Sequence, residues 1–391
     1  MERRVAFESS FAIAEAVKMA DIDVCAAYPI TPQTHIVERV AQLVANGELD
    51  ANYVPVDSEH SALSACLGSS AAGGRTFTAT AGQGLELMHE VVYVASGMRL
   101  PIVMSVCNRA LSVPLSIWGD HSDVMSVRDT GWIQIFAENA QQAFDLTLCA
   151  FHIAEDPAVL LPTMIHIDGF HLSHVIEPVL LPEQEKVTEF LPKYHHPFAL
   201  NVNNPVAMGD FALPDLYTEA KVAHDMALRN SIKVILQVWQ KFGEEFGREY
   251  SPVETYGAED ADILLLTMGS FSEVAMEAID RLKRAGEKVG LVRLRLWRPF
   301  PFEQFRRTVG RAKLLIVLDR ALSVGGPGPV CSEVQAALYH LKERPQVIGF
   351  IGGLGGRDIS VESFQNMIHR GMGKANQGKL GEIEVFDVRE K

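Results

Sequence analysis

Between residue 10 and about residue 166, short apolar runs alternate with segments of helical periodicity. The runs, each the length of one buried strand, are Val24–Tyr28, Tyr53–Val56, Thr76–Ala79, Ile102–Cys107, Trp132–Phe136 and Ala158–Ile165. The segments with apolar residues every three or four positions are Thr34–Ala45, His60–Ala72, Gly84–Ser96, Val124–Asp129 and Ala140–Glu155. Because the strands are continuously apolar, the pattern predicts a parallel sheet covered by helices on both faces.

This alternation stops at about residue 168 and resumes near residue 258. Six prolines from Pro178 to Pro214 interrupt the intervening stretch, and one long helical pattern follows at Ala220–Phe246. We interpret residues 168–258 as a packed connection between two domains, so that the first domain with most of its connector spans residues 1–245.

A second, smaller α/β domain is predicted over residues 258–370. Its expected strands are Ala261–Met268, Val289–Leu294, Lys313–Leu318 and Gln346–Ile351. Glycines punctuate the remaining residues, 371–391, which we expect to form a mobile surface tail.

Composition narrows the class of protein. The 391 residues are 48% hydrophobic, and no apolar run approaches the ~18 residues of a membrane span. With 35 Lys and Arg against 49 Asp and Glu, the chain carries a formal charge of −14 and has no basic block, which argues against nucleic-acid binding.

The five cysteines, Cys25, Cys66, Cys107, Cys149 and Cys331, form no CxxC pair and no Cys/His cluster. We therefore expect no bound metal, no iron–sulfur cluster and no disulfide framework in this chain. Glu and Ser break the N-terminal apolar positions, so a signal peptide is not expected. These features favour a reduced, cytoplasmic protein.

Two segments place candidate functional residues where strands end. Pro29 and Pro32 fix the backbone of a turn that follows the first strand, and Glu59 begins the helix after the second. Ligands of open α/β sheets bind at such carboxyl ends. The same residue types also suit a rigid turn and a helix cap, so neither segment alone establishes a site.

A third segment contains Gly82 and Gly84 at a strand-to-helix turn, but it lacks the spacing of a known phosphate-binding loop. In a fourth, a strand ends at Asn108 and Arg109, before a loop that holds His121 and several aspartates. An arginine there suits a carboxylate ligand, although an ion pair within the loop explains it equally well.

Two glycine-rich segments, Ser323–Val330 and Ile351–Asp358, do not have the strand–GxGxxG–helix arrangement of a dinucleotide site. The sequence IDGF at Ile167–Phe170 resembles part of the motif that binds Mg²⁺ and thiamine diphosphate, but its leading glycine is missing. A complete diphosphate-anchoring motif is absent from the sequence.

Larger segments, taken together, carry a resemblance that spans nearly the whole chain. They are YPITP at Tyr28–Pro32, Ser58–Thr80, Ser96–Pro114, Ile117–Asn139, MGDF at Met208–Phe211, LRLWRPFP at Leu294–Pro301, DR at Asp319–Arg320 and GLGGRD at Gly353–Asp358. In combination they closely resemble the alpha subunit of multi-subunit 2-oxoacid:ferredoxin oxidoreductases, in particular the pyruvate synthase type.

The resemblance implies a fold and a set of partners. The fold is α/β: a thiamine-diphosphate-binding-fold pyrimidine domain built on a parallel sheet, plus a smaller transketolase C-terminal-like α/β domain. Thiamine diphosphate would be shared with the beta subunit, whereas Mg²⁺ and the [4Fe–4S] clusters would lie on partner subunits. The implied partners are the beta, gamma and delta subunits, pyruvate, coenzyme A and ferredoxin.

The resemblance also implies roles for single residues. Glu59 matches the catalytic glutamate that hydrogen-bonds the aminopyrimidine ring of the cofactor, and Pro29 and Ile30 would contact that ring through the backbone. Thr31 and Arg109 match residues that bind the substrate, and Arg109 would bind the carboxylate of the substrate. Gln33 departs from the serine familiar in pyruvate enzymes, a change that could suit a larger oxoacid.

We therefore expect oxidative decarboxylation of pyruvate to acetyl-CoA and CO₂, with electrons passed reversibly to ferredoxin. The alternatives are the same scaffold acting on 2-oxoglutarate, a branched-chain oxoacid, an arylglyoxylate or oxalate, and the beta chain of a lipoamide-linked oxoacid dehydrogenase. A non-catalytic scaffolding partner is a third alternative. The sequence does not indicate which residues contact coenzyme A, the subunit stoichiometry or the physiological direction.

Overall fold

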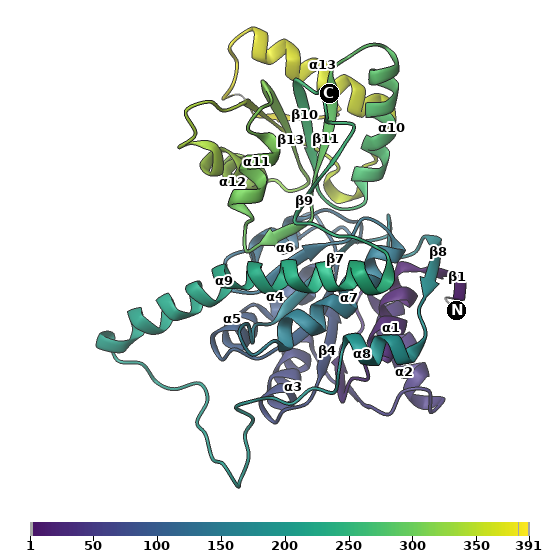
Figure 1. Cartoon of the computed structure of the whole chain (residues 1–391), viewed down its shortest axis with the longest axis vertical. Coiled ribbons are helices and arrows are strands. Elements are labelled where there is room, and N and C mark those ends of the chain that lie inside the picture. Colours follow the sequence, from purple (N-terminus) through teal and green to yellow (C-terminus); the bar gives the residue numbers. More distant parts are fainter. Residues whose placement is uncertain (1–2, 382, 390–391) are drawn as a thin grey trace.

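A computed structural model describes residues 3–381 and 383–389 and shows two α/β domains, the smaller stacked on the larger (Figure 1). The larger contains a seven-stranded sheet of order β12-β6-β7-β5-β4-β2-β3. Its strands are β2 (Val24–Ala27), β3 (Asn52–Pro55), β4 (Thr76–Thr80), β5 (Ile102–Asn108), β6 (Ile133–Phe136), β7 (Thr163–Asp168) and β12 (Leu296–Arg298). All neighbours pair in parallel except β12 and β6, as the continuously apolar runs predict.

Helices cover both faces of this sheet. One face is packed by α1 (Ser9–Met19), α2 (Thr34–Ala45) and α7 (Ala140–Glu155), and the other by α3 (Glu59–Ala71), α4 (Gly82–Leu87) and α5 (His89–Gly97). Successive residues of β2 divide between the faces: Cys25 and Ala27 are buried with the first group and Ala26 with the second. The sheet is therefore apolar on both sides, because both sides are covered.

The smaller domain is built in the same way around a six-stranded sheet of order β15-β14-β13-β10-β11-β9. Its strands are β9 (Val253–Tyr256), β10 (Ile263–Thr267), β11 (Val289–Leu294), β13 (Leu314–Asp319), β14 (Gln346–Ile351) and β15 (Glu384–Val385). Helices α10 (Phe271–Arg284) and α13 (Val361–Asn376) pack one face, and α11 (Phe302–Val309) and α12 (Pro329–Leu338) the other. The predicted α/β fold class is confirmed for both units.

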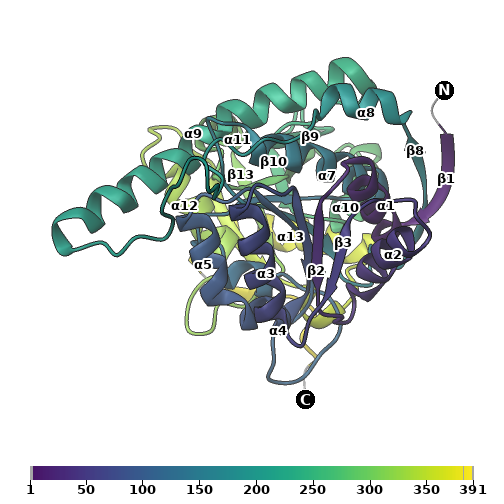
Figure 2. The same cartoon turned by 90° about the horizontal axis from the view of Figure 1, so that it is seen from below.

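The connector contains β8 (Ile176–Leu181), which pairs antiparallel with β1 (Arg3–Glu8), then α8 (Gln184–Phe190) and the 33-residue helix α9 (Pro214–Phe246). Only the second half of α9 is buried, from Ser231 onward, and it packs on α7. Its first half and the segment before it project from the body of the molecule (Figures 1 and 2). We call residues 200–228 the arm.

The structure differs from the sequence prediction at several elements. Strand β12 lies in the second-domain half of the sequence but joins the first sheet, and its three residues are too few to show a periodicity. The helix predicted at Gly84–Ser96 is two helices, α4 and α5, separated at Met88. The tail boundary expected at Arg370 falls inside α13, and β15 pairs with β14 beyond it; residues 382 and 390–391 of that tail lie outside the described residues.

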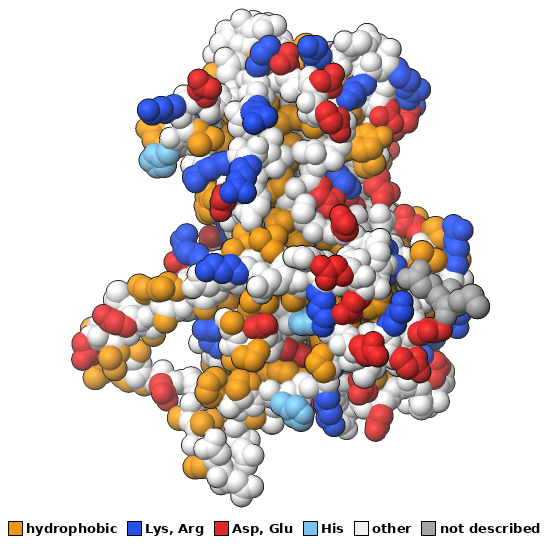
Figure 3. All heavy atoms as spheres, in the orientation of Figure 1, with side chains coloured by type: hydrophobic (Ala, Val, Ile, Leu, Met, Phe, Trp, Pro, Cys, Tyr) orange, Lys and Arg blue, Asp and Glu red, His pale blue; other side chains and the backbone are white. Residues whose placement is uncertain are grey.

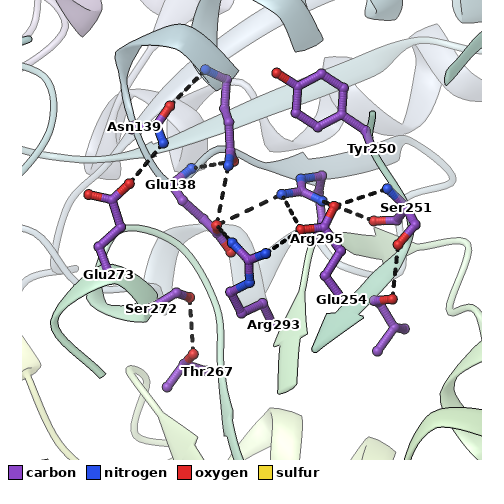
Figure 4. Close-up of polar contacts among 12 residues, drawn as sticks. Glu138, Asn139, Tyr250, Ser251, Glu254, Thr267, Ser272, Glu273, Arg293 and Arg295 are labelled. Atoms are coloured by element: carbon purple, nitrogen blue, oxygen red, sulfur yellow. Dashed lines mark hydrogen bonds and ion pairs between the residues drawn. The ribbon is translucent and has the colours of Figure 1, made fainter. Parts of the chain in front are cut away.

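Buried ion pairs join the two domains (Figure 4). Arg293 donates to Glu138 Oε2 of the first domain at 2.7 Å and to Glu254 Oε2 at 2.6 Å. Arg295 donates to Glu254 Oε2 at 3.2 Å, and its Nη2 lies 3.8 Å from Glu138 Oε2. Two arginines thus share two glutamates, and Asn139 adds a bond to Glu273 of α10 at 2.8 Å. Glu138 is compensated only while the domains stay together, because both of its arginine partners belong to the second-domain half of the chain.

Candidate active site

The expected site residues lie at a topological switch point of the first sheet. The chain passes from β2 to β3 on one side and then to β4 on the other, so the carboxyl ends of β2 and β4 form a switch point, the place where open α/β sheets bind ligands. The turn Tyr28–Gln33 follows β2, and the Gly82–Gly84 turn follows β4. Glu59 enters from the helix that follows β3.

Gln33 connects the two strand ends. Its side chain is fully buried, and its amide nitrogen donates to Tyr28 O at 3.1 Å and to Ala79 O at 2.7 Å. Gln33 therefore holds the Tyr28–Pro32 turn against β4 through main-chain oxygens. The sequence difference at this position acts on the shape of the turn, a role that only the fold reveals.

Glu59 is the first residue of α3 and is 6% exposed. The preceding Ser58 caps the helix by accepting a hydrogen bond from Ser61 N at 3.2 Å. Within the described residues, no protein group hydrogen-bonds the Glu59 carboxylate. A carboxylate with so little access to water and no protein partner is suited to a polar ligand.

Gly84 lies directly against this carboxylate. A Cβ at Gly84 would lie 2.7 Å from Glu59 Oε1 and 2.6 Å from Thr80 Oγ1, a buried hydroxyl that also has no partner among the described residues. Only glycine leaves this space free, since real Cβ contacts are longer than 3.0 Å. The glycine at this turn thus keeps Glu59 accessible.

Arg109 lies on the other side of the same turn and is 7% exposed. Its Nε donates to Ser116 O at 2.9 Å and its Nη1 to Thr31 O at 3.1 Å. The third nitrogen, Nη2, has no protein acceptor within the described residues. Burial lowers the pKa of Arg109 and the nearby Asp123 raises it; an arginine stays charged at neutral pH. One donor edge is therefore available to an anionic ligand.

The structure thus brings the expected residues together around one turn. Arg109 bonds the backbone of Thr31, its side-chain carbons pass Gly82 at 3.0–3.2 Å from the position of a Cβ, and Gly84 faces Glu59. Pro29 and Thr31 are exposed, and Ile30 is half-buried against the core. Contact of Pro29 and Ile30 with a cofactor stays a prediction.

The second domain contacts the loop that follows Arg109 through hydrogen bonds to Gly119 and Asp120. Gly355 N donates to Asp120 Oδ2 at 3.0 Å, and Gly356 N to Gly119 O at 2.7 Å. Both glycines have positive φ, of 56° and 77°. The glycine-rich segment at Gly353–Asp358 is therefore an interdomain contact.

Buried Asp168, at the end of β7, is the aspartate of the IDGF segment, and the sequence analysis gave it no role. Its Oδ1 pairs with the Arg320 guanidinium of the second domain and lies 2.9 Å from His121 Nε2, and its Oδ2 accepts two bonds from Ser270 at 2.7 Å. Burial alone would raise the pKa of Asp168, but Arg320 and His121 hold it well below its ordinary value. Arg320 lies 152 residues from Asp168 in the sequence, so the local IDGF pattern could not indicate this pairing.

All five cysteines are free and buried. Within residues 3–381 and 383–389, no group of three or more His, Cys, Asp and Glu side chains is arranged to hold a metal ion. In the same part of the chain, every helix is too short or too polar to cross a membrane.

Two family profiles match the chain. The first, "Pyruvate flavodoxin/ferredoxin oxidoreductase, thiamine diP-bdg", matches residues 15–239, and "Pyruvate:ferredoxin oxidoreductase core domain II" matches residues 261–364. The chain belongs to the pyruvate flavodoxin/ferredoxin oxidoreductase family. The family expected from the sequence is confirmed, and the lipoamide-linked alternative is set aside.

Individual relatives within this family are similar over their whole length. The chain is 45% identical to pyruvate synthase subunit PorA of Pyrococcus furiosus, over 97% of this chain and 96% of that protein. It is also 45% identical to ketoisovalerate oxidoreductase subunit VorA of Pyrococcus horikoshii, over 97% of each.

A solved structure shows the same fold. The 2-oxoglutarate:ferredoxin oxidoreductase from Magnetococcus marinus, with 2-oxoglutarate, coenzyme A and succinyl-CoA bound, matches with a TM-score of 0.72 at 20% identity. The match covers 94% of this chain and 65% of that one.

Proposed function

We propose that the chain is the alpha subunit of a thiamine-diphosphate-dependent pyruvate:ferredoxin oxidoreductase. The enzyme would convert pyruvate and coenzyme A to acetyl-CoA and CO₂ and pass two electrons reversibly to ferredoxin. The observation that carries the proposal is the buried carboxylate of Glu59 beside Gly84, at the switch point of the sheet, which none of the described residues hydrogen-bonds. The similarity to pyruvate synthase subunits supports pyruvate as substrate.

The residues at the switch point fit the cofactor. Residues 1–245, with the connector at about 168–258, would be the pyrimidine-binding domain, and residues 258–370 the transketolase C-terminal-like domain. When bound, thiamine diphosphate supplies the electron sink that decarboxylation of a 2-oxoacid requires. Glu59 would hold the aminopyrimidine ring by accepting a hydrogen bond from a ring N–H on its carboxylate and so tune the basicity of that ring, with Pro29 and Ile30 beside it.

Arg109 and Thr31 would bind the substrate. The free Nη2 edge of Arg109 suits the carboxylate of a 2-oxoacid, and Ser116 O and Thr31 O fix the plane of the guanidinium. Because that carboxylate leaves as CO₂, Arg109 is expected to position the substrate rather than stabilise the transition state.

A branched-chain 2-oxoacid is the second candidate substrate. The ketoisovalerate oxidoreductase subunit is as similar to this chain as the first pyruvate synthase subunit, at 45% identity. Overall identity therefore does not distinguish the two, and the substrate is best assigned by comparing kcat/KM for pyruvate and for 2-oxoisovalerate.

We further propose that beta, gamma and delta subunits complete the enzyme, and that Mg²⁺ and the [4Fe–4S] clusters lie on them. Apolar side chains gather on the arm (Figure 3), including Val202 at 95% and Phe211 at 89% exposure. A groove of about 630 Å³ lies between α9 and the segment from β12 to α11 of the second domain, and charged side chains such as Lys221, Asp225 and Arg298 line it together with Tyr93 and Phe300. The exposed apolar side chains of the arm suit a contact with a partner subunit. A cytoplasmic location stays a prediction.

Purification of the native complex tests this proposal. Mass spectrometry should identify the copurifying chains, and pyruvate should reduce ferredoxin only when coenzyme A and thiamine diphosphate are both present. Copurification of a lipoyl protein, or reduction that does not require thiamine diphosphate, would contradict the assignment.

A further inference from the structure

Asp123 is a fully buried carboxylate that bonds two separate parts of the candidate site. It lies in the first turn of α6 (Ser122–Ser126). Its Oδ2 accepts hydrogen bonds from the main-chain nitrogens of Arg109, at 2.9 Å, and of Gly82, at 3.0 Å. Asp123 Oδ2 therefore connects Arg109, which is expected to bind the substrate, with the turn at Gly82 beside Glu59.

The other oxygen of Asp123 is occupied as well. Oδ1 accepts from Asn108 Nδ2 at 3.0 Å and from Val124 N at 2.7 Å. Four donors thus surround the carboxylate, and both of its oxygens act only as acceptors. Burial raises the pKa of Asp123 to about 7, and the bonds from Arg109, Asn108 and Gly82 oppose that rise.

The two elements that Asp123 joins are also in contact with each other. Gly82 has a φ of +43°, and the side-chain carbons of Arg109 lie 3.0–3.2 Å from where its Cβ would be. Two residues further on, Gly84 lies against Glu59. A shift of Asp123 would therefore move Arg109 and the turn beside Glu59 together.

We propose that Asp123 is a positioning residue for 2-oxoacid binding, which fixes the backbone of Arg109 and of Gly82 in one geometry. The inference rests on the proposed function, because it assigns Arg109 to the substrate carboxylate. Asp123 does not touch the substrate; it acts through Arg109.

Steady-state kinetics of the complex with Asp123→Asn test the proposal. Whichever way the amide of Asn is turned, its NH₂ group faces two N–H donors, so two of the four hydrogen bonds are lost. We expect KM for the 2-oxoacid to rise by about tenfold or more while KM for coenzyme A changes less than about twofold. Asp260→Asn, the same substitution at a side chain 67% exposed on the second domain, is the matched control and should leave both constants unchanged. Equal rises in both constants would overturn the proposal.

A double-mutant cycle separates positioning from a general structural effect. If Asp123 acts through Arg109, Asp123→Asn should have little further effect on the 2-oxoacid KM in an Arg109→Ala background. The same fold-change in both backgrounds would contradict the proposal. Asn108→Ala, which removes one of the four donors, should raise the 2-oxoacid KM in the same direction by a smaller factor.

Hydrogen exchange of the full chain tests the geometry without any assay. In Asp123→Asn, peptides that contain Gly82 and Arg109 should exchange at least about tenfold faster, while peptides of β10 exchange as in the wild type. Unchanged exchange at both amides would overturn the inference even if pyruvate is the substrate. Faster exchange there, in a complex that turns over no 2-oxoacid, would uphold the geometry and refute the proposed function.

Discussion

Arg109 donates from Nη1 to the main-chain oxygen of Thr31 at 3.1 Å, which joins the loop after β5 to the turn after β2. Ser116 O holds the same guanidinium through Nε at 2.9 Å. The arginine is thus fixed in direction before any substrate arrives, with Nη2 available. Preorganisation of this kind favours binding because little side-chain freedom remains to be lost.

Replacement of Arg109 tests its role in substrate binding. Lysine keeps the charge but cannot reproduce the planar donor geometry, so Arg109→Lys should raise KM for the 2-oxoacid by about tenfold or more, and Arg109→Ala further. KM for coenzyme A should hardly change. Lys313→Ala, at a side chain 76% exposed on the second domain, is the control. Parallel rises in both KM values would argue against a carboxylate-binding role.

Gly84→Ala tests the access to Glu59. The added Cβ would lie 2.7 Å from Glu59 Oε1, so the carboxylate or the turn has to move. Overpacking of this kind costs about 1–3 kcal/mol, and we expect the thiamine diphosphate concentration for half-maximal activity to rise about tenfold or more. Gly373→Ala, in α13 with open space around it, is the control and should be about 0.5–1 kcal/mol more stable. Equal cofactor requirements in the two variants would count against the geometry.

The ion pairs at the domain junction predict that loss of a buried arginine destabilises the chain far more than loss of an exposed one. Arg295→Met leaves Glu254 and Glu138 with one arginine between them in a buried setting, which should lower the free energy of unfolding by about 3–5 kcal/mol. Arg307→Met, which breaks an exposed ion pair with Glu303, should cost less than about 1 kcal/mol. Chemical denaturation of the chain measures both, and similar losses would show that the junction charges contribute little.

The contact between Asp168 and Arg320 predicts a pH dependence of stability. The pKa of Asp168 in the folded chain lies below that of an unfolded aspartate, about 3.9. Its contribution is therefore complete above about pH 4 and is lost as the pH falls toward the folded pKa. The stability deficit of Asp168→Asn should be constant from pH 8 to pH 6 and shrink below about pH 4. A deficit that grows on acidification would contradict this assignment.

Local patterns in the sequence predicted most of the fold. Continuously apolar strands separated by amphipathic segments indicated a parallel sheet, and Val289–Leu294 and Ala140–Glu155 have the predicted bounds. Strand β12 could not be found in this way, because three residues carry no period and its partner β6 lies about 160 positions earlier in the chain.

Some residues of the candidate site were predicted from the sequence, and the role of another is shown only by the structure. Glu59, Thr31 and Arg109 were predicted because each lies in a segment that resembles the family. Gln33 appeared as a departure that could alter substrate size, whereas the structure shows its buried amide bonded to Tyr28 O and Ala79 O. Hydrogen bonds to main-chain oxygens depend on the folded path of the chain, so residue types alone do not indicate them.

Thiamine diphosphate dependence at Glu59 is the central claim, and one measurement tests it most directly. A reconstituted complex that carries Glu59→Ala should assemble with all partner subunits, since Glu59 makes no hydrogen bond to another described residue, and yet release CO₂ from [1-¹⁴C]pyruvate at a rate lower by a factor of about 100 or more. Asp260→Asn, assembled in parallel, should release CO₂ at the wild-type rate. Release of CO₂ at the wild-type rate by the assembled Glu59→Ala complex would contradict the account.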